Sequence, residues 1–238
     1  MIINIITSMP GILDALNHGV IGHAIKQKII TVNIISIRDF SNRDDRRIDD
    51  RPYGGGPGMV LEAEPLYQAL QSIDSTENHY TVEMCPQGQP LSRELLTKLT
   101  PNTSLTIICG RYEGIDHRLQ SSIDQKVSIG DYVLSGGEIP AMVLIDALAR
   151  LQPGTISSDS IAQDSFEDQL LDHAHFTRPE TWRGQSVPSI LLSGNHSQIA
   201  EYRLAQSLGN TWLNRPDLLL NRPLSDKELR LLVDFLTE

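Results

Sequence analysis

The sequence contains only two cysteines among its 238 residues, Cys85 and Cys109. Two thiols cannot form the disulfide framework of a small secreted protein, so we expect free cysteines in a reducing compartment. No apolar run approaches the roughly 20 residues that a membrane-spanning helix needs. The apolar residues 1–7 lack the basic segment and the small-residue cleavage site of a signal peptide. We therefore expect a cytoplasmic protein without a membrane partner.

Motifs of several common enzyme classes are also missing. There is no H-E-x-x-H or C-x-x-C pair, so we predict no metal ligands, and His173 and His175 are expected to be polar surface or core residues. Ser135 does not lie in a G-x-S-x-G turn, which argues against a hydrolase. The glycine-rich segments have neither the lysine of a P-loop nor the G-x-G-x-x-G pattern of a dinucleotide site.

Acidic residues outnumber basic residues by 30 to 20, which gives a formal net charge of −10. That balance alone argues against a nucleic-acid partner, because neutralising phosphates favours basic surfaces. The charges are unevenly placed, however, and five arginines fall within residues 38–51: Arg38, Arg43, Arg46, Arg47 and Arg51. Five aspartates are interleaved with them, so a solvated loop of cancelling charges is the alternative interpretation. Net charge does not settle the partner.

The first 150 residues alternate strand-like and helical patterns. Apolar, β-branched runs of strand length occur at 2–6, 31–37, 80–84 and 105–109, and helical patterns at 12–16, 21–28, 65–73, 92–99 and 139–151. This alternation predicts an α/β fold with a parallel sheet covered on both faces. Residues 39–59 interrupt it with a long loop, and loops of that length usually have a function.

The pattern changes after residue 151. Residues 152–166 are rich in serine, threonine, glycine and proline, as in a linker. Residues 198–208 have helical spacing, and Ser225-Asp-Lys-Glu228 is a capping box before another helical pattern. We predict an α/β domain at 1–160, an interdomain linker at 161–170 and a small, all-helical domain at 171–238.

Three glycine-bearing segments could carry chemistry: Arg51-Pro-Tyr-Gly-Gly-Gly-Pro-Gly-Met59, Cys109-Gly-Arg-Tyr-Glu-Gly-Ile-Asp116 and Ser128-Ile-Gly-Asp-Tyr-Val-Leu-Ser-Gly-Gly-Glu138. Glycine lets a ligand or another backbone approach closely. Ligands of open α/β sheets bind beyond the carboxyl ends of the strands. We therefore predict a pocket shared by the three loops, with three separate structural turns as the alternative.

These three segments, together with Leu191-Leu-Ser-Gly-Asn-His196, closely resemble one family in order and spacing. It is the bacterial tRNA (guanine-N1)-methyltransferases of the SPOUT, or α/β-knot, superfamily. The resemblance covers nearly the whole chain. It implies a deep trefoil knot in the α/β domain, S-adenosylmethionine as the methyl donor, a tRNA substrate, and a homodimer whose active sites are built from both subunits. Met9-Pro-Gly11 departs from the family's usual Phe-Pro-Glu.

The resemblance also implies site residues. The donor pocket is expected to contain Met84, Pro86, Gly110, Tyr112, Glu113, Ser128, Ile129, Gly130, Asp131, Tyr132, Val133, Leu134, Gly136, Gly137 and Pro140. The catalytic residues are expected at Arg150 and Asp164, and the RNA contacts at Asp49, Arg51 and Gly58. The helical domain would hold the tRNA. Family members depend on Mg²⁺, and Glu113 is a candidate neighbour of that ion.

These roles agree with the chemistry of the implied reaction, methyl transfer to N1 of the guanine immediately 3′ of the anticodon. That nitrogen carries a proton at neutral pH, which the Asp164 carboxylate can accept as a general base. Arg150 can stabilise the negative charge that develops on O6. Two alternatives are a SPOUT methyltransferase acting on another RNA site and a catalytically silent RNA-binding protein.

Overall fold

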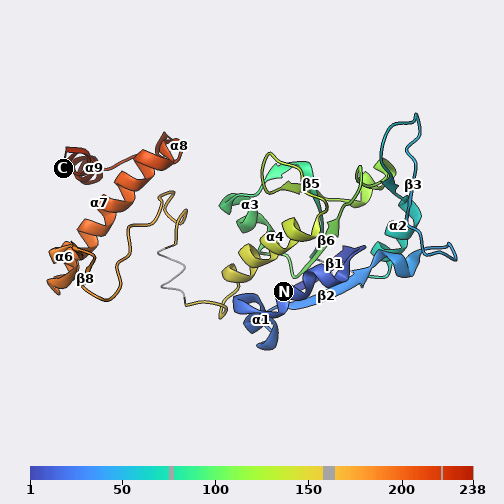
Figure 1. Cartoon of the computed structure of the whole chain (residues 1–238), viewed down its shortest axis with the longest axis horizontal. Helices are drawn as coiled ribbons and strands as arrows, with labels where there is room; N and C mark the ends of the chain where they lie inside the picture. Colours follow the sequence, from blue (N-terminus) through green and yellow to red (C-terminus); the bar gives the residue numbers. More distant parts are fainter. Residues whose placement is uncertain (75–77, 158–163, 221, 238) are drawn as a thin grey trace. The chain divides into compact units, whose positions relative to one another are not determined.

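The computed structural model describes residues 1–74, 78–157, 164–220 and 222–237 (Figure 1). The chain splits into two compact units, Met1–Ser157 and Ser158–Glu238. The start of the predicted linker, residues 161–163, lies outside the described residues.

The first unit is built on a five-stranded sheet in the order β2-β1-β6-β5-β7. Every neighbouring pair in it is parallel, as the sequence predicts. The strands are β1 (Ile2–Thr7), β2 (Thr31–Ser36), β5 (His79–Pro90), β6 (Ser104–Cys109) and β7 (Gln125–Ser128). The sequence did not predict β7, because it is short and begins with the polar pair Gln125 and Lys126.

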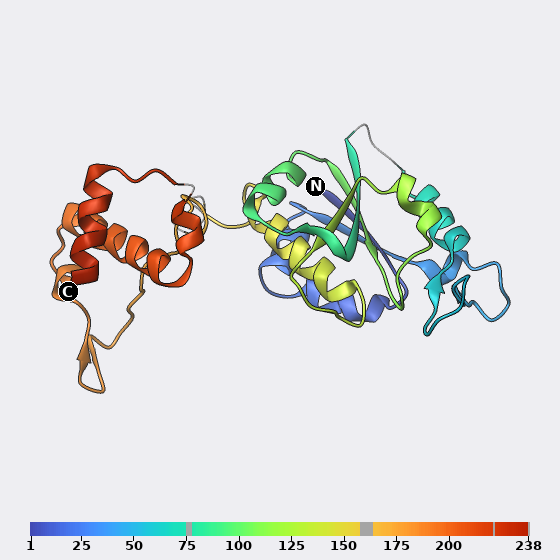
Figure 2. The ribbon, with the colours of Figure 1, turned by 90° about the horizontal axis from the view of Figure 1, so that it is seen from above.

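Helices cover both faces of this sheet (Figure 2). They are α1 (Gly19–Lys26), α2 (Ala63–Gln71), α3 (Arg93–Leu99) and α4 (Glu138–Leu151), with 3₁₀ helices η1 (Pro10–Asn17), η2 (Ile37–Phe40) and η3 (His117–Ser122). Along β1, Ile3 and Ile5 face the cluster formed with η1, α3 and α4, whereas Ile6 faces the cluster formed with α2, η2 and η3. The alternation follows from the period of two in a strand.

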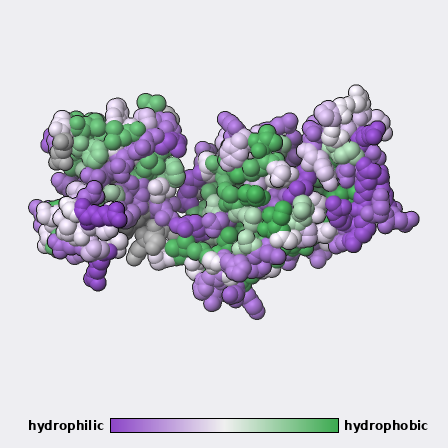
Figure 3. Space-filling model, viewed as in Figure 1, coloured by the Kyte–Doolittle hydropathy of each residue, from purple (hydrophilic) through white to green (hydrophobic). Residues whose placement is uncertain are grey.

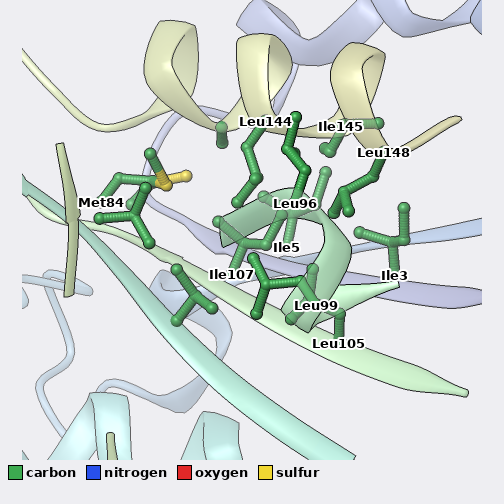
Figure 4. Packing of buried hydrophobic residues seen from close by; sticks show 14 of the residues in the cluster. Ile3, Ile5, Met84, Leu96, Leu99, Leu105, Ile107, Leu144, Ile145 and Leu148 are labelled. Carbon is green, nitrogen blue, oxygen red and sulfur yellow. The ribbon is translucent and has the colours of Figure 1, made fainter. Parts of the chain in front are cut away.

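The α4 helix packs on the sheet core (Figure 4). Its residues Ala141, Leu144, Ile145 and Leu148 are completely buried, at the i, i+3, i+4, i+7 spacing of an amphipathic helix. Figure 4 shows the last three pointing down toward Leu96 and Leu99 of α3 and toward the strands. This packing fixes the beginning of α4, which forms part of the site described below.

The charged loop at 39–59 is less irregular than predicted. Its first residues belong to η2, and two-residue strands β3 (Asp49–Asp50) and β4 (Val60–Leu61) pair antiparallel around it. Ile48 is completely buried and anchors the loop in the second core cluster. The part of the loop that is rich in arginine and aspartate is hydrophilic, as the purple surface around β3 in Figure 3 shows.

The second unit contains α6 (Ser189–Leu192), α7 (His196–Asn214), α8 (Pro216–Leu220) and α9 (Asp226–Thr237) around buried Leu170, Leu208, Leu219 and Leu232. The predicted capping box is confirmed, because the Ser225 backbone N–H donates to Glu228 Oε2 at 2.8 Å and the Glu228 N–H donates to Ser225 Oγ at 3.3 Å. Among the described residues, no helix is both long and apolar enough to cross a bilayer.

The prediction of an all-helical second domain is wrong in one respect. Strands β8 (Thr181–Trp182) and β9 (Gln185–Ser186) form an antiparallel hairpin. Its two turn residues, Arg183 and Gly184, have φ angles of +50° and +80°. Such left-handed residues build the two-residue turns whose twist matches that of the strands. The run is too short for its alternation to be visible in the sequence.

Candidate functional site

A pocket of about 290 Å³ lies at the carboxyl ends of β5, β6 and β7. Three chain segments form its walls: the bulge that interrupts β5 after Met84, the loop after β6, and the loop between β7 and α4. This is the edge of a parallel sheet at which ligands usually bind. The second and third glycine-bearing segments therefore do share one pocket. The first segment does not line the pocket but packs beside it.

Fourteen of the fifteen residues predicted for the donor site line this pocket: Met84, Pro86, Gly110, Tyr112, Glu113, Ser128, Ile129, Gly130, Tyr132, Val133, Leu134, Gly136, Gly137 and Pro140. Asp131 is exposed and is not among the lining residues. The lining also includes residues that sequence reasoning missed: Glu83, Cys85, Gln87, Arg111, Gly114, Val127 and Ser135. Each is an immediate neighbour of a predicted site residue, which is the signal that could have found them.

A close backbone contact holds the two glycine loops together. The Gly137 N–H donates a 2.8 Å hydrogen bond to the Gly110 carbonyl. A Cβ at Gly137 would lie only 2.7 Å from the Cys109 Cα, so no other residue fits at this position without moving the backbone.

Burial, and then the nearby Glu138 carboxylate, raise the pKa of the Cys109 thiol. Cys109 is therefore a neutral packing residue rather than a nucleophile.

A buried ion pair forms the second connection between these loops. Arg111 Nη2 lies 3.0 Å from Glu138 Oε2, and Arg111 Nε donates to Glu138 Oε1 at 3.1 Å. The Thr7 hydroxyl at the end of β1 donates to the same Oε1 at 2.7 Å. Only 2% of the Glu138 side chain and 16% of the Arg111 side chain are exposed. A bidentate pair with a third partner holds the loop after β6 and the start of α4 in one arrangement.

The first glycine-bearing segment abuts the pocket wall through Gly58. A Cβ on Gly58 would lie 2.2 Å from Glu113 Oε1, and the Gly58 φ of +81° is itself one that favours glycine. The Glu113 N–H donates to the Met59 carbonyl at 2.9 Å, and the Leu61 N–H donates to Gly114 at 3.0 Å. The end of the charged loop is thus attached to the loop after β6.

The other two predicted RNA-contacting residues, Asp49 and Arg51, lie earlier in the same loop. Asp49 is half-buried in β3, with Arg47 Nε 3.8 Å from its carboxylate, and Arg51 is exposed. Charge cancellation is partly observed, since Arg43 pairs with Asp50 and Glu62, and Arg46 pairs with Asp39. Arg51 makes no ion pair within the part of the chain that the structure describes.

The two predicted catalytic residues belong to different compact units. Arg150 is half-buried in the last turn of α4. Asp164 is half-buried in the second unit, where its carbonyl accepts a 3.3 Å hydrogen bond from the Glu167 N–H. Arg150 is thus described within the first unit and Asp164 within the second, and the roles of both residues remain predictions.

Comparison with known proteins decides the family. The family model described as "tRNA (Guanine-1)-methyltransferase TrmD" matches residues 1–221. The chain belongs to this family. A relative from Coxiella burnetii (strain CbuG_Q212), named tRNA (guanine-N(1)-)-methyltransferase, is 49% identical over 242 residues, covering 100% of this chain and 98% of the relative. One of the same name from Salmonella newport (strain SL254) is 46% identical over 243 residues, covering 100% and 95%.

Membership in the tRNA (guanine-1)-methyltransferase family confirms the resemblance read from the four motifs. Two of these motifs contribute most of the pocket lining, and a third supplies Gly58 beside it. In this chain, three of the four motifs therefore lie at or beside one pocket of the first unit.

Proposed function

We propose that this protein transfers a methyl group from S-adenosylmethionine to N1 of the guanine immediately 3′ of the anticodon in tRNA. The observation that carries the proposal is the pocket at the sheet edge, whose lining contains nearly every residue expected to hold the donor, in a chain of this family. Because the substrate is tRNA, we also place the enzyme in the cytoplasm.

The chemistry of the pocket suits the donor. Its volume of about 290 Å³ is near the lower end of the ~300–1,000 Å³ found for small-molecule sites. Met84 and Val127 are buried apolar residues of the lining, while the glycines, which lack a Cβ, let an adenine ring approach the backbone closely. S-adenosylmethionine, when bound, supplies a methyl group that its sulfonium has already activated. The remaining task of the pocket is to align the reacting atoms.

Two side chains would act on the guanine. The Asp164 carboxylate would accept the N1 proton, which makes the nitrogen nucleophilic. The Arg150 guanidinium would donate to O6 and stabilise the negative charge left by that proton. The target base must leave its stack to reach the pocket, at a cost of a few kcal/mol. Asp49, Arg51 and Gly58 would contact the RNA near this base, and the second unit would hold the rest of the tRNA.

We further propose a knotted α/β domain and a homodimer with shared sites. The contact of Gly137 with Cys109 and Gly110 supports a threaded arrangement of the segment before α4. An exposed apolar surface supports the dimer, because Val133, Ile139 and Val143 are 85%, 50% and 42% exposed. Sedimentation of the wild type should give a dimer. A fully active monomer would contradict the shared sites.

Mg²⁺ does not fit the pocket residues well enough to assign it a role. Glu83 and Glu113 are the acidic residues of its lining, and Glu83 Oε2 already lies 3.8 Å from Lys126 Nζ. The one group of three ligating side chains among the described residues is Asp172, His173 and His175 in the second unit. Magnesium is usually held by one or two carboxylates together with substrate phosphates. No step of the proposed reaction depends on the ion.

The decisive experiment uses S-adenosylmethionine with a labelled methyl group and two tRNA transcripts. The transcripts differ only in having G or A immediately 3′ of the anticodon. We expect label in the G transcript alone, recovered as N1-methylguanosine after digestion. Label on ribose or at another base would indicate a different RNA methyltransferase. No label, with tRNA still bound, would indicate a catalytically silent RNA-binding protein.

A further inference from the structure

A second cavity, of about 540 Å³, lies within the second unit. The irregular segment 173–178 forms one side of it, and residues of α6 and α7 form another. Two arginines line the cavity, Arg178 from the irregular segment and Arg203 from α7, and both are exposed to solvent. The cavity is therefore open to a ligand and carries cationic groups on two separate walls.

The two guanidiniums are available for binding. In the same unit, Arg215 and Arg222 pair with Asp217 and Glu228 at 2.8 Å and 2.7 Å. Over the residues that the structure describes, neither Arg178 nor Arg203 has such a partner.

Two acidic residues bear on the charge of this cavity. Glu180 lines it, whereas the Asp172 carboxylate is occupied by His175 Nε2 at 2.8 Å. Two unpaired arginines thus oppose one free carboxylate, and the cavity favours an anion.

The β8–β9 hairpin rises from the rim of this cavity. Glu180 and Val187 both line the cavity, and the Val187 N–H donates to the Glu180 carbonyl at 2.9 Å, closing the base of the hairpin. At its tip, Trp182 is 56% exposed, and the Arg183 guanidinium lies 4.9 Å from the centre of its ring. An exposed indole with an adjacent guanidinium is the kind of platform on which unpaired bases stack.

We propose that the cavity and the hairpin together form a binding site for unpaired nucleotides of RNA. Arg178 and Arg203 hold a backbone phosphate in the cavity, and Trp182 stacks on a neighbouring base. Arginine suits this role because its planar fork matches phosphate oxygens. The site explains how an acidic chain binds RNA, since a few unpaired cations are placed together although the whole chain carries a charge of −10. The inference rests on the proposed function for the identity of the RNA, which is tRNA.

The phosphate contacts are tested by the salt dependence of tRNA affinity in the full-length protein. Arg178→Gln and Arg203→Gln should each lower the slope of log affinity against log salt by about 0.7–0.9, the value of one phosphate contact. The matched control is Arg230→Gln, which removes the same charge from an exposed arginine of α9 outside the cavity lining. The control should leave the slope unchanged.

The stacking contact is tested at Trp182. Trp182→Ala should weaken tRNA binding about fivefold to about 150-fold, the effect of losing one stacked base, and Trp182→Phe should retain most of the affinity. The chain has two tryptophans, so in a Trp212→Phe background Trp182 is the sole indole reporter. tRNA should then quench its fluorescence, which keeps the test available even where Trp182→Ala does not fold.

Failure of this inference can be told from failure of the proposed function. The inference is overturned if the wild type methylates tRNA but the three arginine variants share one salt slope and Trp182 neither quenches nor affects affinity. If the wild type binds tRNA through this site but transfers no methyl group, the proposed function fails while the site stands. If the wild type binds no tRNA, both fail.

Discussion

Replacing Arg111 with methionine would remove the cation from a carboxylate that is almost completely buried. Glu138 has 2% of its side chain exposed, and it would keep only the 2.7 Å hydrogen bond from Thr7. Removing one partner of a buried ion pair typically costs about 3–5 kcal/mol, because the other charge stays buried without compensation. We expect about 3 kcal/mol here, since the Arg111 side chain keeps 16% of its surface in water.

The same substitution should weaken donor binding. Arg111 connects the two loops that form most of the pocket. Without this connection, the free Arg111→Met variant must reorder the two loops before the donor can bind. A reordering cost of only about 1.4 kcal/mol weakens the affinity tenfold. Isothermal titration calorimetry with S-adenosylmethionine measures this loss directly.

The stability measurement needs a probe of the first unit. Both tryptophans, Trp182 and Trp212, lie in the second unit, so their fluorescence does not report on the pocket. Amide hydrogen exchange of β6 and α4 measures the stability of the first unit in the Arg111→Met variant. The control is Arg111→Met/Glu138→Leu, which replaces the whole pair by apolar side chains. We expect it to be more stable than Arg111→Met alone, because no buried charge is left unpaired.

Two results would refute this reasoning. One is an Arg111→Met variant with wild-type exchange rates and wild-type donor affinity, which would mean that the pair does not hold the loops. The other is a double variant whose stability loss equals the sum of the two single losses. Such additivity would show that the two side chains do not interact energetically.

Three further predictions follow from the described contacts and the proposed chemistry. Asp164→Asn should lower the turnover rate about 10²- to 10⁴-fold, the usual contribution of a general base, without changing the affinity for the donor; a wild-type rate in single-turnover assays would show that another group takes the proton. Gly137→Ala should destabilise the first unit by at least about 1–3 kcal/mol, because its Cβ would lie 2.7 Å from the Cys109 backbone, and urea unfolding followed by far-ultraviolet circular dichroism measures this loss. The third prediction concerns pH: burial alone would raise the pKa of Glu228, but hydrogen bonds from Ser225 and Arg222 more than offset it and lower the pKa from 4.5 to about 2. The stability that Glu228 contributes is therefore complete above about pH 5 and is lost as the pH falls toward 2, and Glu228→Gln should flatten this part of the tryptophan-monitored stability profile.

The local elements of the fold followed from the sequence because their causes are local. The isoleucine-rich runs of β1 and β6 are buried on both faces of the sheet, and only a parallel sheet covered by helices accommodates such runs. The hydrogen bonds of the capping box join Ser225 and Glu228, which are only three positions apart, so the residue types alone predict the start of α9. By contrast, β7 and the β8–β9 hairpin are too short or too polar for a periodic pattern to reveal them.

The motifs by themselves indicated two of the three segments that form the pocket, and the family they indicate is the family to which the chain belongs. The tertiary structure decided how those loops are held. The Arg111–Glu138 pair joins residues 27 positions apart, Thr7 joins Glu138 across 131 positions, and Glu83 and Val127 reach the pocket only through strand order. Contacts between distant residues depend on how the sheet brings strands together, and that arrangement minimises the free energy of the whole chain rather than of any segment. For the same reason, the unpaired arginines around the second cavity became visible as a group only after folding placed α7 beside the segment 173–178.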